Sequence, residues 1–304
     1  MKILVTGISG YVGGELVPRL QRDGHDVVGL TRDRRRVTAD VPVIEGDVLT
    51  GAGLTEALDG VDVAYYLIHA MEASADGPFA ERERTGAERF ASAARSAGLR
   101  RIVYLGGPAP QSGPASLHLS SRLEVERLLL SAVPDSVALR ASIVIGARSR
   151  SFRFLVRLVE RLPVLAVPAW HGNRTAPIDE RDVLSLLTEA ATNDAVSGRS
   201  LDIAGPDTVT YGELILRIRD LMLLGRPTFK FRRLMVTPIA SRVAAAIAGE
   251  EPELIEPLME SLATDLLPRD DEAARLLGVR MHRLDAAIEH ALAVWEQTEP
   301  LAAR

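Results

Sequence analysis

The hydrophobic pattern of the first half of the chain alternates between two kinds of segment. Short, nearly continuous apolar runs predict buried strands, and the stretches between them repeat apolar positions every three to four residues, which predicts amphipathic helices. The predicted strands span residues 2–6, 26–31, 41–45, 61–67 and 101–105, and a sixth lies within 137–145. The predicted helices span residues 11–23, 54–58, 81–97 and 119–131. This alternation predicts an α/β fold of the Rossmann type, a doubly wound parallel sheet with right-handed crossovers.

The pattern changes after residue 148. Helices are predicted at residues 152–161, 181–192 and 211–223, and strands only at 200–203 and 228–231. We therefore predict a dinucleotide-binding Rossmann domain over residues 1–148 and a smaller, mainly helical cap or substrate region over residues 149–304. Such a cap would cover the carboxyl edge of the sheet, where ligands of these folds bind. Strands of the second region can return to the main sheet.

A glycine-rich turn between the first strand and the first helix is the strongest chemical signal. Gly7 permits a tight turn, Gly10 lets the backbone approach a pyrophosphate, and Gly13 allows the helix to pack closely on the strand. The anion would then meet free N–H groups and the positive end of the helix dipole. The alternative is a glycine turn without a ligand, but the strand before it and the helix after it favour a cofactor. The residues predicted to contact the cofactor here are Gly7, Ser9, Gly10, Tyr11, Val12 and Gly13.

The end of the second predicted strand indicates which dinucleotide binds. NAD-specific sites place an acidic residue there to hold the ribose 2′-hydroxyl. Here the position holds Arg32, and Asp33 comes one residue late. Because a guanidinium can pair with a 2′-phosphate, we predict that Arg32 contacts the cofactor and that the cofactor is NADP(H). The run 34–36, which is all arginine, is expected to be a solvated charged loop.

Two further strand ends carry candidate cofactor residues. Asp47 and Val48 follow the third strand, where a carboxylate can accept a hydrogen bond from the adenine amino group. The alternative for Asp47 is a turn or helix N-cap role. Leu67 and His69 end the fourth strand, near the expected cofactor ribose, although a histidine at such a position more often packs against a loop or caps it.

Four blocks of sequence accompany the glycine turn: GDV (46–48), YYLIHAM (65–71), VYLGG (103–107) and SSRLEVE (120–126). Together they resemble the NmrA-like atypical short-chain dehydrogenase/reductases, in their bacterial NAD(P)H-binding subgroup. The resemblance covers most of the chain. It implies a Rossmann domain, a bound dinucleotide and a small C-terminal substrate region. The members of that family include reductases, quinone- or flavin-related enzymes and redox sensors.

The chain departs from this superfamily at the catalytic Tyr-x-x-x-Lys pair. None of its five tyrosines has a lysine four residues later, and the fifth strand ends without the usual serine. At the equivalent position stand His118 and Arg122. Arg122 can replace the lysine in holding ribose hydroxyls, and His118 can shuttle a proton near neutral pH. The structural alternatives are an exposed loop histidine and a surface ion pair between Arg122 and Glu126.

Composition narrows the remaining function classes. The 304 residues include no cysteine, which excludes disulfides and a cysteine nucleophile, and the histidines lack metal-ligand spacing. The net charge of −5 argues against a nucleic-acid partner. No apolar stretch approaches the about 18 residues of a membrane span, and the apolar run at the N-terminus is too short for a signal peptide. We expect a cytoplasmic monomer or homodimer with a small-molecule substrate, no metal and no membrane partner.

Three functions fit these features. The first, which we expect, is an NADP(H)-dependent oxidoreductase acting on a small carbonyl, enone or quinone, since the cofactor carries the chemistry and the protein mainly positions it. The second is a non-catalytic NADP(H) sensor or interaction protein, which the missing Tyr–Lys pair favours. The third is a redox-neutral isomerase, cyclase or lyase on the same fold.

Overall fold

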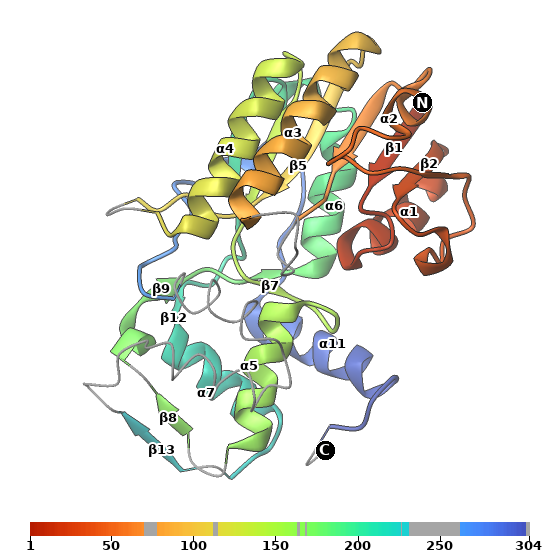
Figure 1. Ribbon diagram of the computed structural model, residues 1–304. Helices are drawn as coiled ribbons and strands as arrows, with labels where there is room; N and C mark the ends of the chain where they lie inside the picture. Colours follow the sequence, from red (N-terminus) through yellow and green to blue (C-terminus); the bar gives the residue numbers. More distant parts are fainter. Residues whose placement is uncertain are drawn as a thin grey trace.

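A seven-stranded parallel sheet forms the centre of the protein, with helices on both faces (Figure 1). The computed structural model describes residues 1–69, 78–111, 115–162, 165–167, 169–225, 227–230 and 262–301. The strand order is β11-β6-β5-β4-β1-β2-β3, which confirms the predicted doubly wound fold of the Rossmann type. The strands are β1 (Lys2–Thr6), β2 (Asp26–Thr31), β3 (Val43–Glu45), β4 (Val63–Tyr66), β5 (Arg101–Gly106), β6 (Val137–Ala141) and β11 (Ser200–Ile203).

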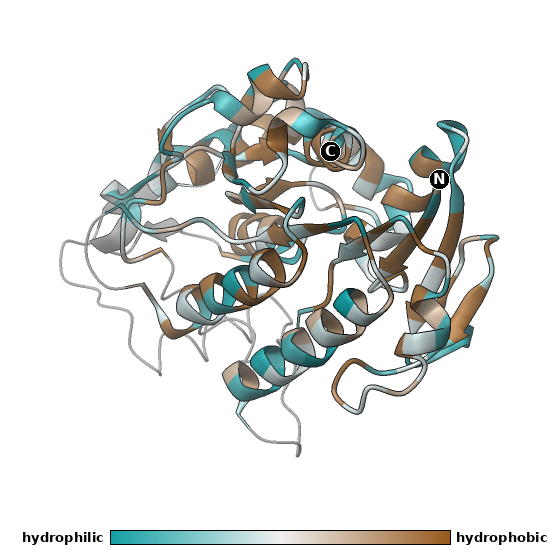
Figure 2. Ribbon diagram, turned by 90° about the horizontal axis from the view of Figure 1, so that it is seen from above, coloured by the Kyte–Doolittle hydropathy of each residue, from teal (hydrophilic) through white to brown (hydrophobic). Residues whose placement is uncertain are grey.

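Alternate residues of each strand feed two cores on opposite faces of the sheet. On β1, Ile3 and Val5 pack toward α1 and α6, whereas Leu4 packs toward α2, α3 and α4. In Figure 2 the strands are largely hydrophobic and the helices alternate between hydrophobic and hydrophilic residues, as expected for a sheet buried on both faces. These helices are α1 (Tyr11–Arg22), α2 (Leu54–Leu58), α3 (Phe79–Ser96), α4 (Leu117–Ala132) and α6 (Glu180–Ala190).

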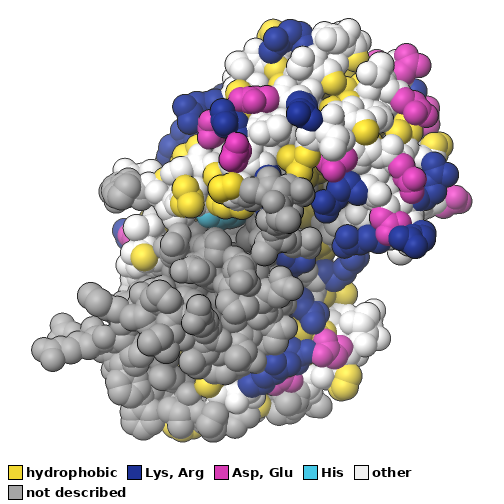
Figure 3. Space-filling view, viewed as in Figure 1, with side chains coloured by type: hydrophobic (Ala, Val, Ile, Leu, Met, Phe, Trp, Pro, Cys, Tyr) yellow, Lys and Arg dark blue, Asp and Glu magenta, His cyan; other side chains and the backbone are white. Residues whose placement is uncertain are grey.

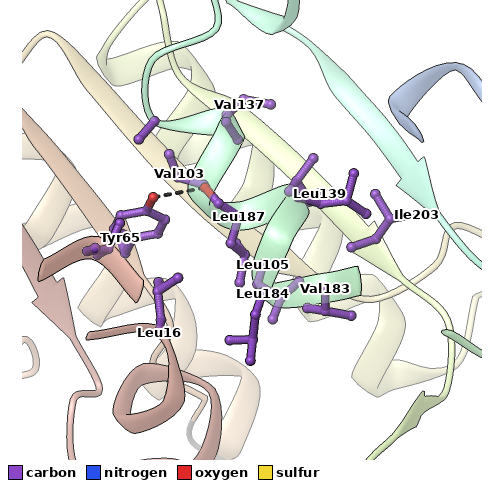
Figure 4. Close-up of a cluster of buried hydrophobic side chains, with 14 of the residues drawn as sticks. Leu16, Tyr65, Val103, Leu105, Val137, Leu139, Val183, Leu184, Leu187 and Ile203 are labelled. Carbon is purple, nitrogen blue, oxygen red and sulfur yellow. Dashed lines mark hydrogen bonds between the residues drawn. The ribbon is translucent and has the colours of Figure 1, made fainter. Parts of the chain in front are cut away.

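The core beneath α6 shows how the second half of the chain joins the sheet. Leu187 of α6 packs among strand side chains that include Val103 and Leu139 (Figure 4). The fully buried Tyr65 hydroxyl donates a hydrogen bond of 2.9 Å to the Leu187 carbonyl oxygen. Tyr65 is therefore a core residue, and its neighbour Tyr66 points to the other face, as the strand period requires.

Residues after 148 contribute both to the main sheet and to a separate group of helices. β11 pairs in parallel with β6 in the register Ser200↔Ala138, which confirms that a strand of the second half returns to the main sheet. The helices α5 (Arg150–Arg161), α7 (Tyr211–Leu221) and α11 (Leu284–Glu296) build a separate core around Trp295, in the lower half of Figure 1. The remaining elements are η1 (Arg34–Arg36), β7 (Val144–Ile145), β8 (Leu165–Val167), η2 (Ala169–Gly172), β9 (Arg174–Thr175), β10 (Ile178–Asp179), η3 (Asp194–Val196), β12 (Val209–Thr210), β13 (Thr228–Lys230) and α10 (Glu272–Leu276).

Most observed boundaries lie within two residues of the predicted ones. The third strand begins at Val43 rather than at residue 41, because Pro42 lacks the N–H group that a strand ladder needs. The stretch 137–145 holds two strands, β6 and β7, because the chain leaves the main sheet and then pairs with β10. The strand predicted at 228–231 is observed as β13, and its last residue lies outside the described residues.

Candidate functional site

A cavity of about 380 Å³ lies at the carboxyl ends of β1 to β4. This is the edge of a doubly wound sheet where ligands bind, at the point where the strand order reverses between β1 and β4. Most of the predicted cofactor residues line it. They are Gly7, Ser9, Gly10, Arg32, Asp47, Val48, Leu67 and His69.

The glycine turn has the geometry of a phosphate cradle. Gly7 adopts a left-handed conformation with φ +69°, and a Cβ there would lie 2.9 Å from the Leu67 carbonyl oxygen. A Cβ at Gly13 would overlap the Gly7 carbonyl oxygen, whereas one at Gly10 would come no nearer than 3.0 Å to that oxygen. Gly10 therefore lies at the cavity surface with room for a close ligand, and the turn fits a dinucleotide pyrophosphate.

The residues that open α1 face away from this cavity. Tyr11 and Val12 line a separate small pocket with Glu180 of α6, and the Tyr11 hydroxyl donates a hydrogen bond to the Glu180 carboxylate. Burial raises the pKa of both groups, with the proximity of Glu180 adding to the shift of Tyr11. Neither Tyr11, Val12 nor Gly13 lines the nucleotide cavity, so any cofactor contact of theirs is left to backbone N–H groups and stays a prediction.

Two arginines line the cavity beyond the end of β2. Arg32 and Arg36 both reach it, and both are exposed. The Asp33 carboxylate accepts hydrogen bonds from the backbone and side chain of Arg35, at 3.0 and 2.9 Å. Arg34 donates to the Val43 carbonyl oxygen. Arg34 and Arg35 are therefore exposed and lie outside the cavity lining, as expected, whereas Arg36 lines the cavity.

The Asp47 side chain serves a turn at the end of β3. Its Oδ1 accepts a hydrogen bond of 2.8 Å from the Leu49 backbone N–H, and its own N–H donates to the Ala52 carbonyl oxygen at 3.0 Å. The turn role weighed from the sequence is therefore observed. Because Asp47 and Val48 also line the cavity, contact with the adenine stays a prediction.

Beside the cavity, three basic side chains form a cluster. Arg122 Nε donates a hydrogen bond of 3.0 Å to His118 Nε2, one turn earlier on α4, and Arg122 Nη1 lies 3.3 Å from His69 Nε2 beyond β4. Burial, reinforced by the charge of Arg122, lowers the pKa of His118 to about 3 and the pKa of His69 well below its usual value. Both imidazoles are therefore uncharged at neutral pH and can accept hydrogen bonds from the guanidinium.

The structural alternatives for the two α4 residues are wrong. His118 is only 7% exposed and packs beside Phe79, with ring centroids 5.8 Å apart. Glu126, the expected ion-pair partner of Arg122, instead binds Arg140 through hydrogen bonds of 2.8 and 2.6 Å. His118 is therefore buried and Arg122 partly buried beside it, but neither lines the cavity, and their role in the site stays a prediction.

Other lining residues carried no distinguishing signal in the sequence. Arg82 and Glu83 reach the cavity from the start of α3, and Glu83 accepts a hydrogen bond of 2.8 Å from Ser121 on α4. Arg150, the first residue of α5, lines it from the second half of the chain. In a chain with so many arginines, only the fold shows which ones converge on a site.

Across the part of the chain that the structure describes, no group of His, Asp and Glu side chains could hold a metal ion. None of the helices in that part is long and apolar enough to cross a membrane.

Comparison with known proteins decides the family. Residues 3–160 match the NAD dependent epimerase/dehydratase family. The chain belongs to this family. An uncharacterized protein of Mycobacterium tuberculosis is 28% identical over 234 residues, which are 76% of this chain and 25% of that protein. The chain thus spans only a quarter of the length of this relative.

Two reductases are also similar to this family member. Ceramide reductase of Caulobacter vibrioides is 26% identical over 217 residues, 70% of this chain and 68% of that protein. dTDP-4-dehydrorhamnose reductase of Mycobacterium tuberculosis is 24% identical over 235 residues, 69% and 71% of the two chains. Among solved structures, UDP-glucuronic acid 4-epimerase from Bacillus cereus in complex with NAD has a TM-score of 0.74 at 17% identity, over 100% and 99% of the two chains. At that identity the likeness shows the fold alone.

Proposed function

We propose that this member of the epimerase/dehydratase family is an NADP(H)-dependent reductase of a small carbonyl, enone or quinone. The observation that carries the proposal is the pair Arg32 and Arg36 at the cavity edge, where an NAD-specific site would hold an acid. The Asp33 carboxylate, which follows Arg32, is bound by Arg35. Because Arg35 neutralises the Asp33 carboxylate, the guanidiniums of Arg32 and Arg36 determine the local charge. Two guanidiniums favour a 2′-phosphate over a 2′-hydroxyl.

The wider charge distribution agrees with an anionic ligand. In Figure 3, Lys and Arg side chains gather where the sheet layer meets the lower half of the molecule, on the side where α1 and β2 lie in Figure 1. Asp and Glu side chains lie among them, and the cavity itself is lined by four arginines and three carboxylate residues, so its lining is slightly basic in a chain of net charge −5. A basic wall around a cavity draws in anions and raises their local concentration.

The chain would hold the cofactor along the whole cavity. The glycine turn would take the pyrophosphate, the arginines after β2 the 2′-phosphate, and the residues after β4 the ribose beside the nicotinamide. The bound nicotinamide would supply the hydride. The protein's own task is then to bind, orient and shield the reactants.

Arg122 would take the ribose-binding role of the missing lysine. Its guanidinium is fixed from two sides, by His118 on its own helix and by His69 beyond β4. Because burial lowers the pKa of His118 to about 3, we assign that imidazole to positioning Arg122 rather than to donating a proton from its charged form. A site without a strong general acid suits an enone or a quinone better than an isolated ketone.

We propose that the enzyme reduces its substrate because two of its relatives are named as reductases. The finer assignment to the NmrA-like subgroup, and with it the cytoplasmic location and the monomer or homodimer, rests on the sequence blocks and composition alone. We retain these as proposals that extend the family assignment.

The test is to mix the purified protein with NADPH and a panel of quinones, enones and simple ketones, and to follow the loss of NADPH absorbance. We expect turnover with at least one quinone or enone, and none from the variant Gly10→Val. NADPH binding without any turnover would contradict the reductase and favour the sensor. Conversion of a substrate without NADPH loss would favour a redox-neutral enzyme.

A further inference from the structure

We propose that Arg150 is a pyrophosphate-binding residue, contributed to the cofactor site by the second half of the chain. It opens α5 and lines the same cavity as Gly7, Ser9 and Gly10. The inference rests on the proposed dinucleotide site and adds a residue that neither the glycine motif nor the family match identifies.

The segment before Arg150 is anchored to the first turns of α1. Gly146 lies so close to this helix that a Cβ there would overlap the Tyr11 hydroxyl and the Glu180 carboxylate. Two residues later, Arg148 Nη1 lies 3.2 Å from Glu15 Oε1 of α1. The Arg148–Glu15 ion pair is exposed and is not needed to hold the segment, whereas the packing at Gly146 is close. Because α1 begins directly after Gly10, that packing places the start of α5 beside the turn that would cradle the phosphates.

A pyrophosphate is an anion, and a cationic side chain beside the glycine turn would stabilise it. Residues 7–13 include no Lys or Arg, so the glycine turn offers a pyrophosphate N–H groups, the Ser9 hydroxyl and the helix dipole but no cation. Arg32 and Arg36 lie beyond β2, where they match the 2′-phosphate instead. Arg82 also lines the cavity but is only 8% exposed on α3, whereas Arg150 is exposed at the start of α5.

This arrangement would link the cofactor to the second core. α5 continues from Arg150 into Phe152 and Leu155, which are buried with Trp295 in the core of the second half. A pyrophosphate bound by both the glycine turn and Arg150 would therefore join the sheet layer to the α5, α7 and α11 layer.

The experiment compares Arg150→Ala with the matched variant Arg148→Ala, from the same segment, by calorimetric titration of the full chain. The ligands are NADP⁺ and NAD⁺, which carry the pyrophosphate, and 2′-AMP, which lacks it. Loss of a charge-assisted hydrogen bond should weaken NADP⁺ and NAD⁺ alike by roughly 10- to 100-fold in Arg150→Ala. Affinity for 2′-AMP should not change, and Arg148→Ala should bind all three ligands like the parent.

Three results would overturn the inference. If Arg150→Ala binds NADP⁺ as Arg148→Ala does, Arg150 does not contact the pyrophosphate. If it also loses affinity for 2′-AMP, Arg150 serves the 2′-phosphate instead. If the parent chain binds neither dinucleotide, the proposed function itself fails, which the parent titration shows separately. Equal thermal melting of the two variants checks that both are folded.

Discussion

Burial sets the protonation of the imidazoles beside the cavity. His118 Nε2 accepts a hydrogen bond from Arg122 Nε, which only the uncharged imidazole can do. Protonation would remove that acceptor and place two cations side by side on α4. The same argument holds for His69, whose pKa is lowered by burial and then by the charge of Arg122.

The substitution His118→Gln tests this protonation state. Because the pKa of His118 is about 3 in the folded chain and near 6.5 when unfolded, the unfolded chain binds more protons between those values. The stability contributed by His118 is therefore present above about pH 6.5 and lost as the pH falls toward 3. Glutamine keeps an acceptor for Arg122 but does not titrate. Between pH 7 and pH 5 the parent should lose about 2 kcal/mol more of its free energy of unfolding than the variant.

Urea unfolding at the two pH values measures this difference. The variant Glu56→Gln changes an exposed titratable group on α2 and serves as a control for the method. Parallel losses of stability in the parent and in His118→Gln would show that His118 already titrates normally, and the assignment of a positioning role would fail.

The prediction of a bound dinucleotide depends on the turn between β1 and α1, where three glycines have different roles. Gly7 and Gly13 are required by the fold, since a Cβ at either would press on backbone atoms. Gly10 has φ −85°, a conformation open to any residue, and it lines the cavity. A Cβ there would make one tight contact, 3.0 Å from the Gly7 carbonyl oxygen, which a shift of a few tenths of an ångström relieves. A side chain at Gly10 should therefore harm the ligand more than the protein.

The substitution Gly10→Val should abolish dinucleotide binding and leave the fold in place. The added methyl groups would fill the space that we assign to the pyrophosphate. The matched variant Gly14→Ala, one turn along α1, adds a Cβ 3.5 Å from the Ile8 carbonyl oxygen, an ordinary contact, and should bind normally. Circular dichroism checks the fold, and titration with NADPH checks binding. Parent-like affinity in Gly10→Val would remove the turn from the site.

Elements with strong local patterns were predictable from the sequence. β1, β2, α2 and β11 match their predicted bounds, because continuous apolar runs and flanking glycines define them locally. The division of residues 137–145 between β6 and β7 was not predictable, because it depends on pairing with β10, far along the chain.

The residues of the candidate site also divide into those that the local sequence predicts and those that only the fold reveals. The glycine turn and Arg32 were found because each follows a recognisable strand end. Glu83 and Arg150 were missed because their place at the cavity depends on how α3 and α5 pack against the sheet. Arg36 was expected to be solvated because nothing in the local sequence distinguishes it from Arg34 and Arg35. The protonation of His118 could not be predicted either, since its burial is a tertiary property.

The two halves of the molecule are joined through α6 as well as through the cavity. The Tyr11 hydroxyl of α1 donates to Glu180, the first residue of α6, in a partly buried pair. His290 of α11 lies 3.9 Å from the same carboxylate. The Glu180 carboxylate therefore connects α1, which follows the glycine turn, with α6 on the sheet and with α11 in the second core.

The substitution Tyr11→Phe should destabilise the protein in a pH-dependent way. Burial raises the pKa of Glu180 and the Tyr11 hydrogen bond opposes that rise, so the ionised carboxylate costs stability above its unfolded pKa. Removing the hydroxyl should cost about 1–3 kcal/mol, with the larger loss at pH 8 and the smaller at pH 5. The control Tyr65→Phe loses a bond to a backbone carbonyl and should show no such pH dependence. Equal losses for Tyr11→Phe at both pH values would contradict the argument.

Cofactor choice tests the central claim most directly. The measurement is calorimetric titration of the parent, Arg32→Ala and Arg34→Ala with NADP⁺ and NAD⁺, where Arg34 is the control because its guanidinium donates to the Val43 carbonyl oxygen and does not line the cavity. We predict that the parent binds NADP⁺ more tightly, and that Arg32→Ala weakens NADP⁺ by roughly 1.5–3 kcal/mol while NAD⁺ and the control barely change. Equal or tighter binding of NAD⁺ by the parent would contradict the proposal that this family member uses NADP(H).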